Sequence, residues 1–207
     1  MGKEVATDPS ASWWARHFRG VWTSFSVLLG IALAVDGYLK FASGYNTGSP
    51  PGIVYDIQNA QAANPSWLSG WFSFWATQAS NNPTGLVYAV GTFELLIGLA
   101  LIFGFIRKFA YVGGIILTLM IWSIPEGFGK IFPISGSQTT DVGTGLIYAI
   151  ALVGLIAISA AVGPNPYTLD YYIERRFPSW ARIAEFGTPL WGPMKPPVEA
   201  APKVSAG

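Results

Sequence analysis

Two long apolar segments, separated only by a basic pair, constrain the fold of this chain more than any other feature. They cover residues 84–106 and 109–124, and Arg107-Lys108 lies between them. A helix rises about 1.5 Å per residue and a hydrocarbon core is about 30 Å thick, so each segment is long enough, or nearly so, to cross a bilayer. The sequence therefore predicts a helical membrane hairpin with a short basic turn.

Two further apolar segments, at 20–42 and 142–163, flank this hairpin in the sequence. The composition agrees with a membrane protein, because 51% of the residues are hydrophobic and only 11% are charged, against about 25% charged in ordinary soluble domains. We therefore predict an all-α integral membrane protein. Its membrane domain, residues 19–170, is expected to be a bundle of four transmembrane helices with a long outer loop at 43–83.

The distribution of positive charge predicts how the bundle lies in the membrane. Ten of the twelve Lys and Arg residues fall in the N-terminal segment 1–18 and its border, in the 107–108 turn, and after residue 170. By the positive-inside rule both termini are cytoplasmic, as expected for a multi-pass protein of the cell (plasma) membrane. The segment 171–207 is then a cytoplasmic surface segment followed by a disordered tail rich in Pro and Ala.

The outer loop contains a tryptophan-rich stretch. Trp67, Trp71 and Trp75 are four residues apart, so they share one face of a helix that we expect to lie at the membrane interface. One interpretation is that these rings only anchor the loop at the interface, as tryptophans commonly do. The other is that the loop covers a site at the outer mouth of the bundle.

Several kinds of chemistry are excluded for this chain. The absence of cysteine excludes disulfides, thiolate metal sites, iron-sulfur ligation and a catalytic thiol. The single histidine, His17, precedes the first apolar segment, so we expect no haem or other metal to be bound within the bundle. A net charge of +1 gives no basic face for nucleic acid.

Glu94 lies ten or more residues from each end of the apolar segment 84–106. An acid at that depth costs a few kcal/mol unless it is paired or neutral. It is a candidate catalytic residue that holds and delivers a proton, with Tyr88 and Tyr148 as hydrogen-bonding neighbours if their helices face it. Alternatively, Glu94 is paired with Lys40, Arg107 or a hydroxyl and only fixes the packing of the helices.

The sequence also resembles the DoxX/DoxD family over about 19–176. The resemblance is carried by residues at the start and end of the first apolar segment, through the second, and after the fourth: Arg19, Gly37, Lys40, Glu94, Gly98, Leu101, Gly104, Arg107, Gly163, Tyr167, Thr168, Leu169 and Asp170. The long outer loop and the C-terminal segment are more similar to the DoxD branch, the larger subunit of archaeal thiosulfate:quinone oxidoreductase.

The resemblance implies an enzyme that oxidises thiosulfate to tetrathionate outside the cell and passes electrons to a membrane quinone, a diffusible substrate. It implies a smaller DoxA-like subunit as partner, in the lipid bilayer and in a possible oligomer. We expect Glu94, Tyr88 and Tyr148 to bind the quinone.

Thiosulfate is a dianion, and Lys40 and Lys130 are the only basic residues in or bordering the outer loops. They are candidate substrate-binding residues together with Trp71, through charge-assisted hydrogen bonds. The alternative is that Lys40 pairs with Asp36 and Lys130 with Glu126, each at a spacing of i and i+4. Asp36, Arg107 and Asp170 are expected to be structural parts of the family pattern, with Asp170 capping or tethering the segment after the last span.

A second functional hypothesis comes from a different class. The chain would be a non-catalytic integral subunit that scaffolds a larger respiratory complex of the terminal oxidase type, since aromatic surface segments on both sides suit docking. A solute transporter is disfavoured, because no broken helix or inverted repeat is evident.

Overall fold

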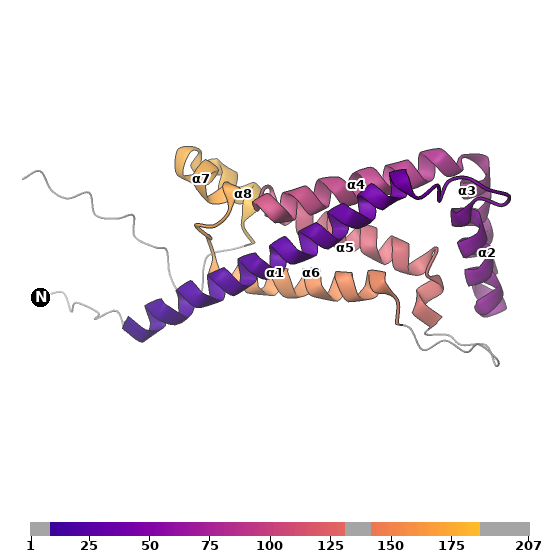
Figure 1. The fold of residues 1–207 in the computed structure, drawn as a ribbon. Helices are drawn as coiled ribbons and strands as arrows, with labels where there is room; N and C mark the ends of the chain where they lie inside the picture. Colours follow the sequence, from indigo (N-terminus) through magenta and orange to yellow (C-terminus); the bar gives the residue numbers. More distant parts are fainter. Residues whose placement is uncertain (1–8, 131–141, 187–207) are drawn as a thin grey trace, which may run out of the picture.

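The computed structural model describes residues 9–130 and 142–186, and these residues form an assembly of helices without a named strand. The longest helices are α1 (Pro9–Ala42), α4 (Pro83–Phe103), α5 (Arg107–Ser123) and α6 (Thr144–Val162). They run lengthwise beside one another (Figure 1). Shorter helices lie at the two ends: α2 (Gly52–Ala63) and α3 (Ser69–Asn81) at one, α7 (Leu169–Arg176) and α8 (Ala181–Ala184) at the other. These are called below the α2–α3 end and the α7–α8 end.

Three of the described helices are long and apolar enough to cross a membrane. They are the part of α1 from His17 to Ala42, and the whole of α4 and α6. The expectation of an all-helical membrane protein is confirmed at this level. Helix α5 packs against α4 and α6 but has only 17 residues, and α1 begins at Pro9, well before its apolar part.

Local sequence explains the ends of α4. The side chain of Asn82 accepts a hydrogen bond from the backbone N–H of Gly85 at 2.9 Å, and Pro83 occupies the first turn, where its missing N–H costs nothing. At the other end Gly104 has φ of 62°, the left-handed conformation that glycine tolerates best. The chain then turns directly into α5, which begins at Arg107, so the turn lies next to the basic pair as predicted.

Glycines bring α1 and α4 into backbone contact. A Cβ atom added to Gly30 would lie 2.7 Å from the carbonyl oxygen of Gly98, and one added to Gly37 would lie 2.7 Å from that of Gly91. Larger residues are excluded at such contacts, which is the usual reason for small residues between membrane helices. The two contacts fix the register of α1 against α4, and this register positions the site described below.

Two hydrophobic clusters hold the helices together. One lies between the long helices and includes Trp22, Leu33, Leu101, Tyr111, Leu152 and Leu155. The other includes Ile57 of α2, Phe72 of α3, Val87 of α4 and Ile124, just after α5. The segment 43–83 therefore contains two helices packed onto one end of the bundle. Of these, α3 covers most of the predicted helix, whereas α2 was not predicted.

Some sequence expectations concern residues that the structure does not describe. These residues are 1–8 in the N-terminal segment, 131–141 before the last apolar segment, and the Pro- and Ala-rich tail from residue 187.

Candidate functional site: a cavity with a buried Lys–Glu pair

A cavity of about 780 Å³ lies among the helices at the α2–α3 end. Near the α7–α8 end, α1 and α6 are held together: Asn165, just after α6, donates a hydrogen bond to Thr23 of α1 at 2.7 Å. Toward α2 and α3 the two helices diverge, and the cavity lies between them there (Figure 1). Its lining comes from α1, α2, α3, α4, α5 and α6 and is mostly apolar, with residues such as Leu33, Val87, Phe93, Leu117, Met120 and Ile121. The polar residues in this lining are therefore the candidates for chemistry.

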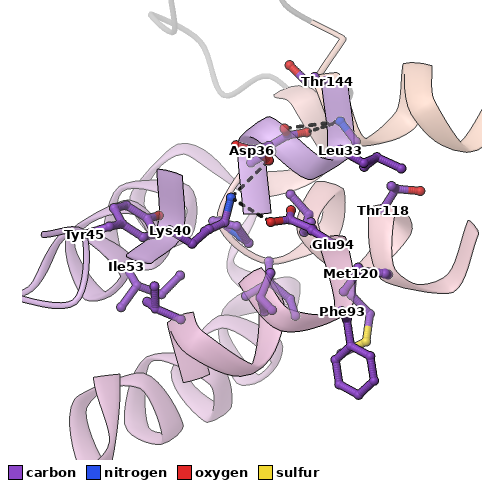
Figure 2. Close-up of a pocket in the computed structure, with 18 of the residues that line it drawn as sticks. Leu33, Asp36, Lys40, Tyr45, Ile53, Phe93, Glu94, Thr118, Met120 and Thr144 are labelled. Carbon is purple, nitrogen blue, oxygen red and sulfur yellow. Dashed lines mark hydrogen bonds and ion pairs between the residues drawn. The ribbon is translucent and has the colours of Figure 1, made fainter. Parts of the chain in front are cut away.

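Lys40 is the centre of the polar part of the cavity (Figure 2). Its Nζ lies 3.1 Å from a carboxylate oxygen of Asp36, one turn earlier on α1, and 3.4 Å from a carboxylate oxygen of Glu94 on α4. The sequence left two pairings open, Lys40 with Asp36 and Lys40 with Glu94. The structure contains both, so one ammonium group faces two carboxylates.

Glu94 is completely buried, with 0% of its side chain exposed. Neither of its carboxylate oxygens has a hydrogen-bond partner among the described residues; Lys40 is at ion-pair distance only. Burial of a carboxylate without hydrogen bonds is costly. Glu94 is thus able to exchange a proton or accept a hydrogen bond from a group that enters the cavity.

Acids outnumber basic residues around this cavity. Within the described part of the chain, its lining contains four acids and one lysine: Asp36, Asp56, Glu94, Glu126 and Lys40. Two of these acids have structural partners. Asp56 accepts a hydrogen bond from the Tyr45 hydroxyl at 2.5 Å, and burial raises the pKa of that hydroxyl. Glu126 accepts the backbone N–H of Gly145 in the first turn of α6, where a carboxylate is favoured.

The predicted quinone-binding tyrosines lie in different surroundings. Tyr148 of α6 lines the cavity, as does the buried Thr118 of α5. Tyr88 is absent from the described lining; it is 38% exposed, and its ring packs 4.9 Å from the ring of Phe41. Only Tyr148 is brought to the same cavity as Glu94.

The predicted substrate residues are also separated. Trp71 does not line the described cavity; its indole N–H donates to the carbonyl of Ser123 at 3.0 Å. Trp75, whose ring meets that of Trp71 edge-on, lines the cavity instead. The side chain of Lys130 lies outside the described part of the structure.

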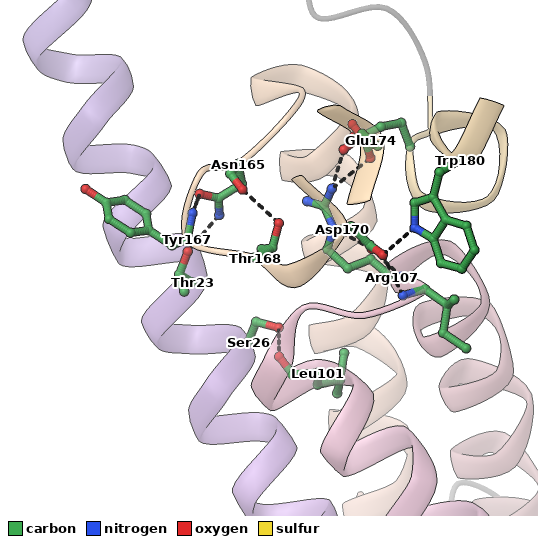
Figure 3. A network of polar contacts seen from close by, with 12 residues as sticks. Thr23, Ser26, Leu101, Arg107, Asn165, Tyr167, Thr168, Asp170, Glu174 and Trp180 are labelled. Carbon is green, nitrogen blue, oxygen red and sulfur yellow. Dashed lines mark hydrogen bonds and ion pairs between the residues drawn. The ribbon is translucent and has the colours of Figure 1, made fainter. Parts of the chain in front are cut away.

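A second polar cluster, at the α7–α8 end, surrounds Arg107 (Figure 3). This side chain is only 1% exposed. Its guanidinium forms ion pairs with Asp170 at 3.1 Å, with Glu174 at 3.9 Å and with Glu185, and lies 5.4 Å from the ring of Trp22. Arg107 is therefore the buried ion-pair partner of three acids.

Asp170 joins this cluster to the turn between α4 and α5. Its carboxylate accepts hydrogen bonds from the backbone N–H groups of Ile106 and Arg107 and from the indole of Trp180, at 2.9, 3.0 and 2.9 Å. Its carboxylate therefore caps the start of α5 and ties this helix to α7, which contains Asp170. The roles of Trp180 and Glu185 were missed, because neither lies near Arg107 in sequence.

The excess of acids around Arg107 affects Glu174. Burial, and then the charge of Glu185, raise the pKa of Glu174 to about 7. This group lies in α7, after the last of the long helices. The second cluster connects α5 to α7 and to the end of α8 through the ion pairs of Arg107.

Together these features define a helical membrane protein with a polar cluster inside a cavity between its helices. Residues 25–124 match the model of the DoxX family. The match covers the part of the chain that carries Lys40, Glu94 and Arg107, and it ends before α6. No curated protein and no solved structure gave a match. Among the described residues, no cluster of three or more His, Cys, Asp or Glu side chains is placed to hold a metal ion.

Proposed function

We propose that the chain is the membrane subunit of a thiosulfate:quinone oxidoreductase and that its cavity binds the quinone headgroup. The observation that carries this proposal is the buried Glu94, ion-paired with Lys40 at the wall of a largely apolar cavity. A quinone headgroup is neutral and apolar except for its two carbonyl oxygens. Such a ligand fits a cavity with few polar groups at defined positions.

The polar residues have separate roles in this proposal. The ammonium of Lys40 and the hydroxyl of Tyr148 donate hydrogen bonds to the quinone oxygens, and Glu94 passes a proton to one of them. In the full reaction two thiosulfate ions lose one electron each and join through a new S–S bond to give tetrathionate. The two electrons and two protons convert the quinone to a quinol.

The charge balance of the cavity supports a role for Lys40 in binding the quinone rather than thiosulfate. The described lining contains one lysine and four acids. Negatively charged carboxylates in a site of low dielectric repel a dianion such as thiosulfate strongly. We propose that thiosulfate is oxidised outside this cavity, at a site completed by a smaller DoxA-like subunit.

The proposal includes an arrangement in the membrane. Helix α5, with 17 residues or about 26 Å of length, acts as the fourth span. The positive-inside rule then places both termini in the cytoplasm and the α2–α3 end outside the cell membrane, with α3 near the interface.

The exposed aromatic face of α3 favours the alternative function, a scaffold in a larger respiratory complex. Trp71 and Phe74 are 39% and 55% exposed, and exposed aromatic groups of this kind are common in docking surfaces.

Turnover measurements distinguish the two functions. The full chain is purified with the partners that accompany it, thiosulfate and a quinone analogue are added, and quinone reduction is followed by absorbance. We expect turnover in the wild-type preparation and a loss of roughly a hundredfold or more in Glu94→Gln, which keeps the size but not the proton-carrying carboxyl. Quinone binding should persist in this variant. Absence of both turnover and quinone binding in the complete wild-type preparation would favour the scaffold.

A further inference from the structure

An apolar groove of about 470 Å³ runs between α4 and α5 on the outside of the bundle. All the residues that line it are apolar or glycine, among them Phe93 and Ala100 from α4 and Ala110, Gly113, Leu117 and Met120 from α5. The groove therefore offers no hydrogen bond to a ligand and suits a hydrocarbon chain.

The groove adjoins the cavity that contains Glu94, and the two share part of their walls. Phe93, Leu117 and Met120 line both spaces. Figure 2 shows the Phe93 ring and the Met120 side chain at one edge of the cavity. Since Glu94 follows Phe93 in the same helix, the buried carboxyl and the start of the groove are adjacent.

The groove is long and has small residues along it. Its residues on α5 recur every three or four positions from Phe109 to Met120, a length of about 17 Å along one helix face. Ala100 and Ala110 are buried in it, and no atom lies within 4 Å of a Cβ added to Gly113. Small side chains leave the space between the two helices open.

We propose that this groove binds the isoprenoid tail of the quinone whose headgroup occupies the cavity. The inference rests on the proposed function and narrows its substrate to quinones with long isoprenoid tails. Because lipid is itself apolar, close packing of the tail between the two helices is what would favour the groove over the bilayer. The headgroup supplies the polar contacts at Lys40 and Glu94, and the tail leaves past Phe93 and Met120.

Gly113→Leu tests the groove directly, because its side chain would fill open space without a backbone clash. Gly154→Leu is the matched control: Gly154 is also a helical glycine with no atom within 4 Å of an added Cβ, it lies in α6, and it is not among the residues that line the groove. Gly113→Ala provides a smaller change at the same place. The full chain is reconstituted, and its affinity is measured for two benzoquinones with the same headgroup, one with an isoprenoid tail and one without.

We expect wild type and Gly154→Leu to bind the tailed quinone more tightly than the tailless one. Gly113→Leu should lose roughly tenfold in affinity for the tailed quinone, with Gly113→Ala between, while affinity for the tailless quinone is unchanged. The proposal would be overturned if wild type bound both quinones with equal affinity, or if Gly113→Leu and Gly154→Leu lost the same affinity for the tailed quinone. The groove would then be a surface that contacts membrane lipid. If wild type binds neither quinone, the proposed function fails, and this inference fails with it.

Discussion

The ammonium group of Lys40 on α1 lies 3.4 Å from the carboxylate of Glu94 on α4, at the wall of the cavity. The glycine contacts between the two helices make this pair possible, since a Cβ added to Gly91 would lie 2.9 Å from the Cβ of Lys40. Helix packing and the chemistry of the cavity therefore depend on the same residues.

Removal of Lys40 should destabilise the protein. In Lys40→Ala the fully buried Glu94 loses its only ion-pair partner among the described residues, and an uncompensated buried charge costs about 3–5 kcal/mol. Chemical denaturation in detergent measures the change. The double variant Lys40→Ala with Glu94→Gln should recover much of the loss; a double variant no more stable than Lys40→Ala would contradict the pairing.

The two tyrosines predicted from sequence should differ in function. Tyr148→Phe removes a hydroxyl from the cavity lining, whereas Tyr88→Phe removes one from outside it. A lost hydrogen bond of about 1–1.5 kcal/mol corresponds to roughly a tenfold weaker quinone affinity. Titration with a quinone analogue should show this change for Tyr148→Phe and a much smaller one for Tyr88→Phe. The reverse order would place the headgroup elsewhere.

Gly37→Ala should separate α1 from α4. The new methyl would lie 2.7 Å from the carbonyl oxygen of Gly91 and 2.9 Å from the Cβ of Glu94, and overpacking of this kind costs about 1–3 kcal/mol. Gly20→Ala in the same helix is the control, because nothing lies within 4 Å of its added Cβ; it should be neutral or slightly stabilising. Thermal denaturation compares them, and equal stability of both variants would exclude the close contact.

Arg107→Ala should destabilise the protein far more than Lys108→Ala. Arg107 is buried among acids, and loss of such a partner costs about 3–5 kcal/mol. Within the described part of the chain, Lys108 donates an exposed hydrogen bond to the carbonyl of Arg182 and lies 5.9 Å from the ring of Phe186. Its loss should therefore cost only about 1 kcal/mol. Similar denaturation midpoints for the two variants would argue against the buried cluster.

The stability of the protein should depend on the protonation of Glu174. Its pKa is raised from 4.5 to about 7, first by burial and then by the charge of Glu185; Asp170 adds to this increase, and Arg107 opposes it. The folded state therefore binds this proton more tightly than the unfolded state does. Its contribution to the free energy of unfolding falls as pH rises from about 4.5 to about 7, by linkage.

Denaturation at several pH values measures this effect. Glu174→Gln, which cannot release the proton, should show a weaker decline of stability over that pH range than wild type. Tyr172→Phe, a change at an exposed residue of the same helix, should retain the wild-type decline. Identical pH dependence of wild type and Glu174→Gln would show that another group is responsible.

The helices were largely predictable, because their apolar content is a property of the local sequence. The pairing of Asp36 with Lys40 was predictable for the same reason, since it needs only one helical turn. The sequence alone does not decide whether Lys40 also forms an ion pair with Glu94. This pairing depends on the register of α1 against α4. The glycines in the two helices indicate that they pack closely, but they are compatible with many registers.

The position of Arg107 could not be inferred from its neighbours. Next to Lys108 and between two apolar segments, it has the pattern of a surface anchor at the membrane. Its partners Asp170, Glu174 and Glu185 come from the C-terminal region of the described chain. Only the folded arrangement of α7 and α8 brings these acids to one guanidinium.

The cap of α5 links the folding of this protein to the order of its synthesis. The N–H groups of Ile106 and Arg107 are held by Asp170, which lies 64 and 63 residues later in the chain. When the ribosome has produced the first hairpin, these donors have no carboxylate to bind, because proteins are made from the N-terminus. The turn is closed only after the last long helix has been translated, so insertion of the hairpin and completion of its turn are separate events.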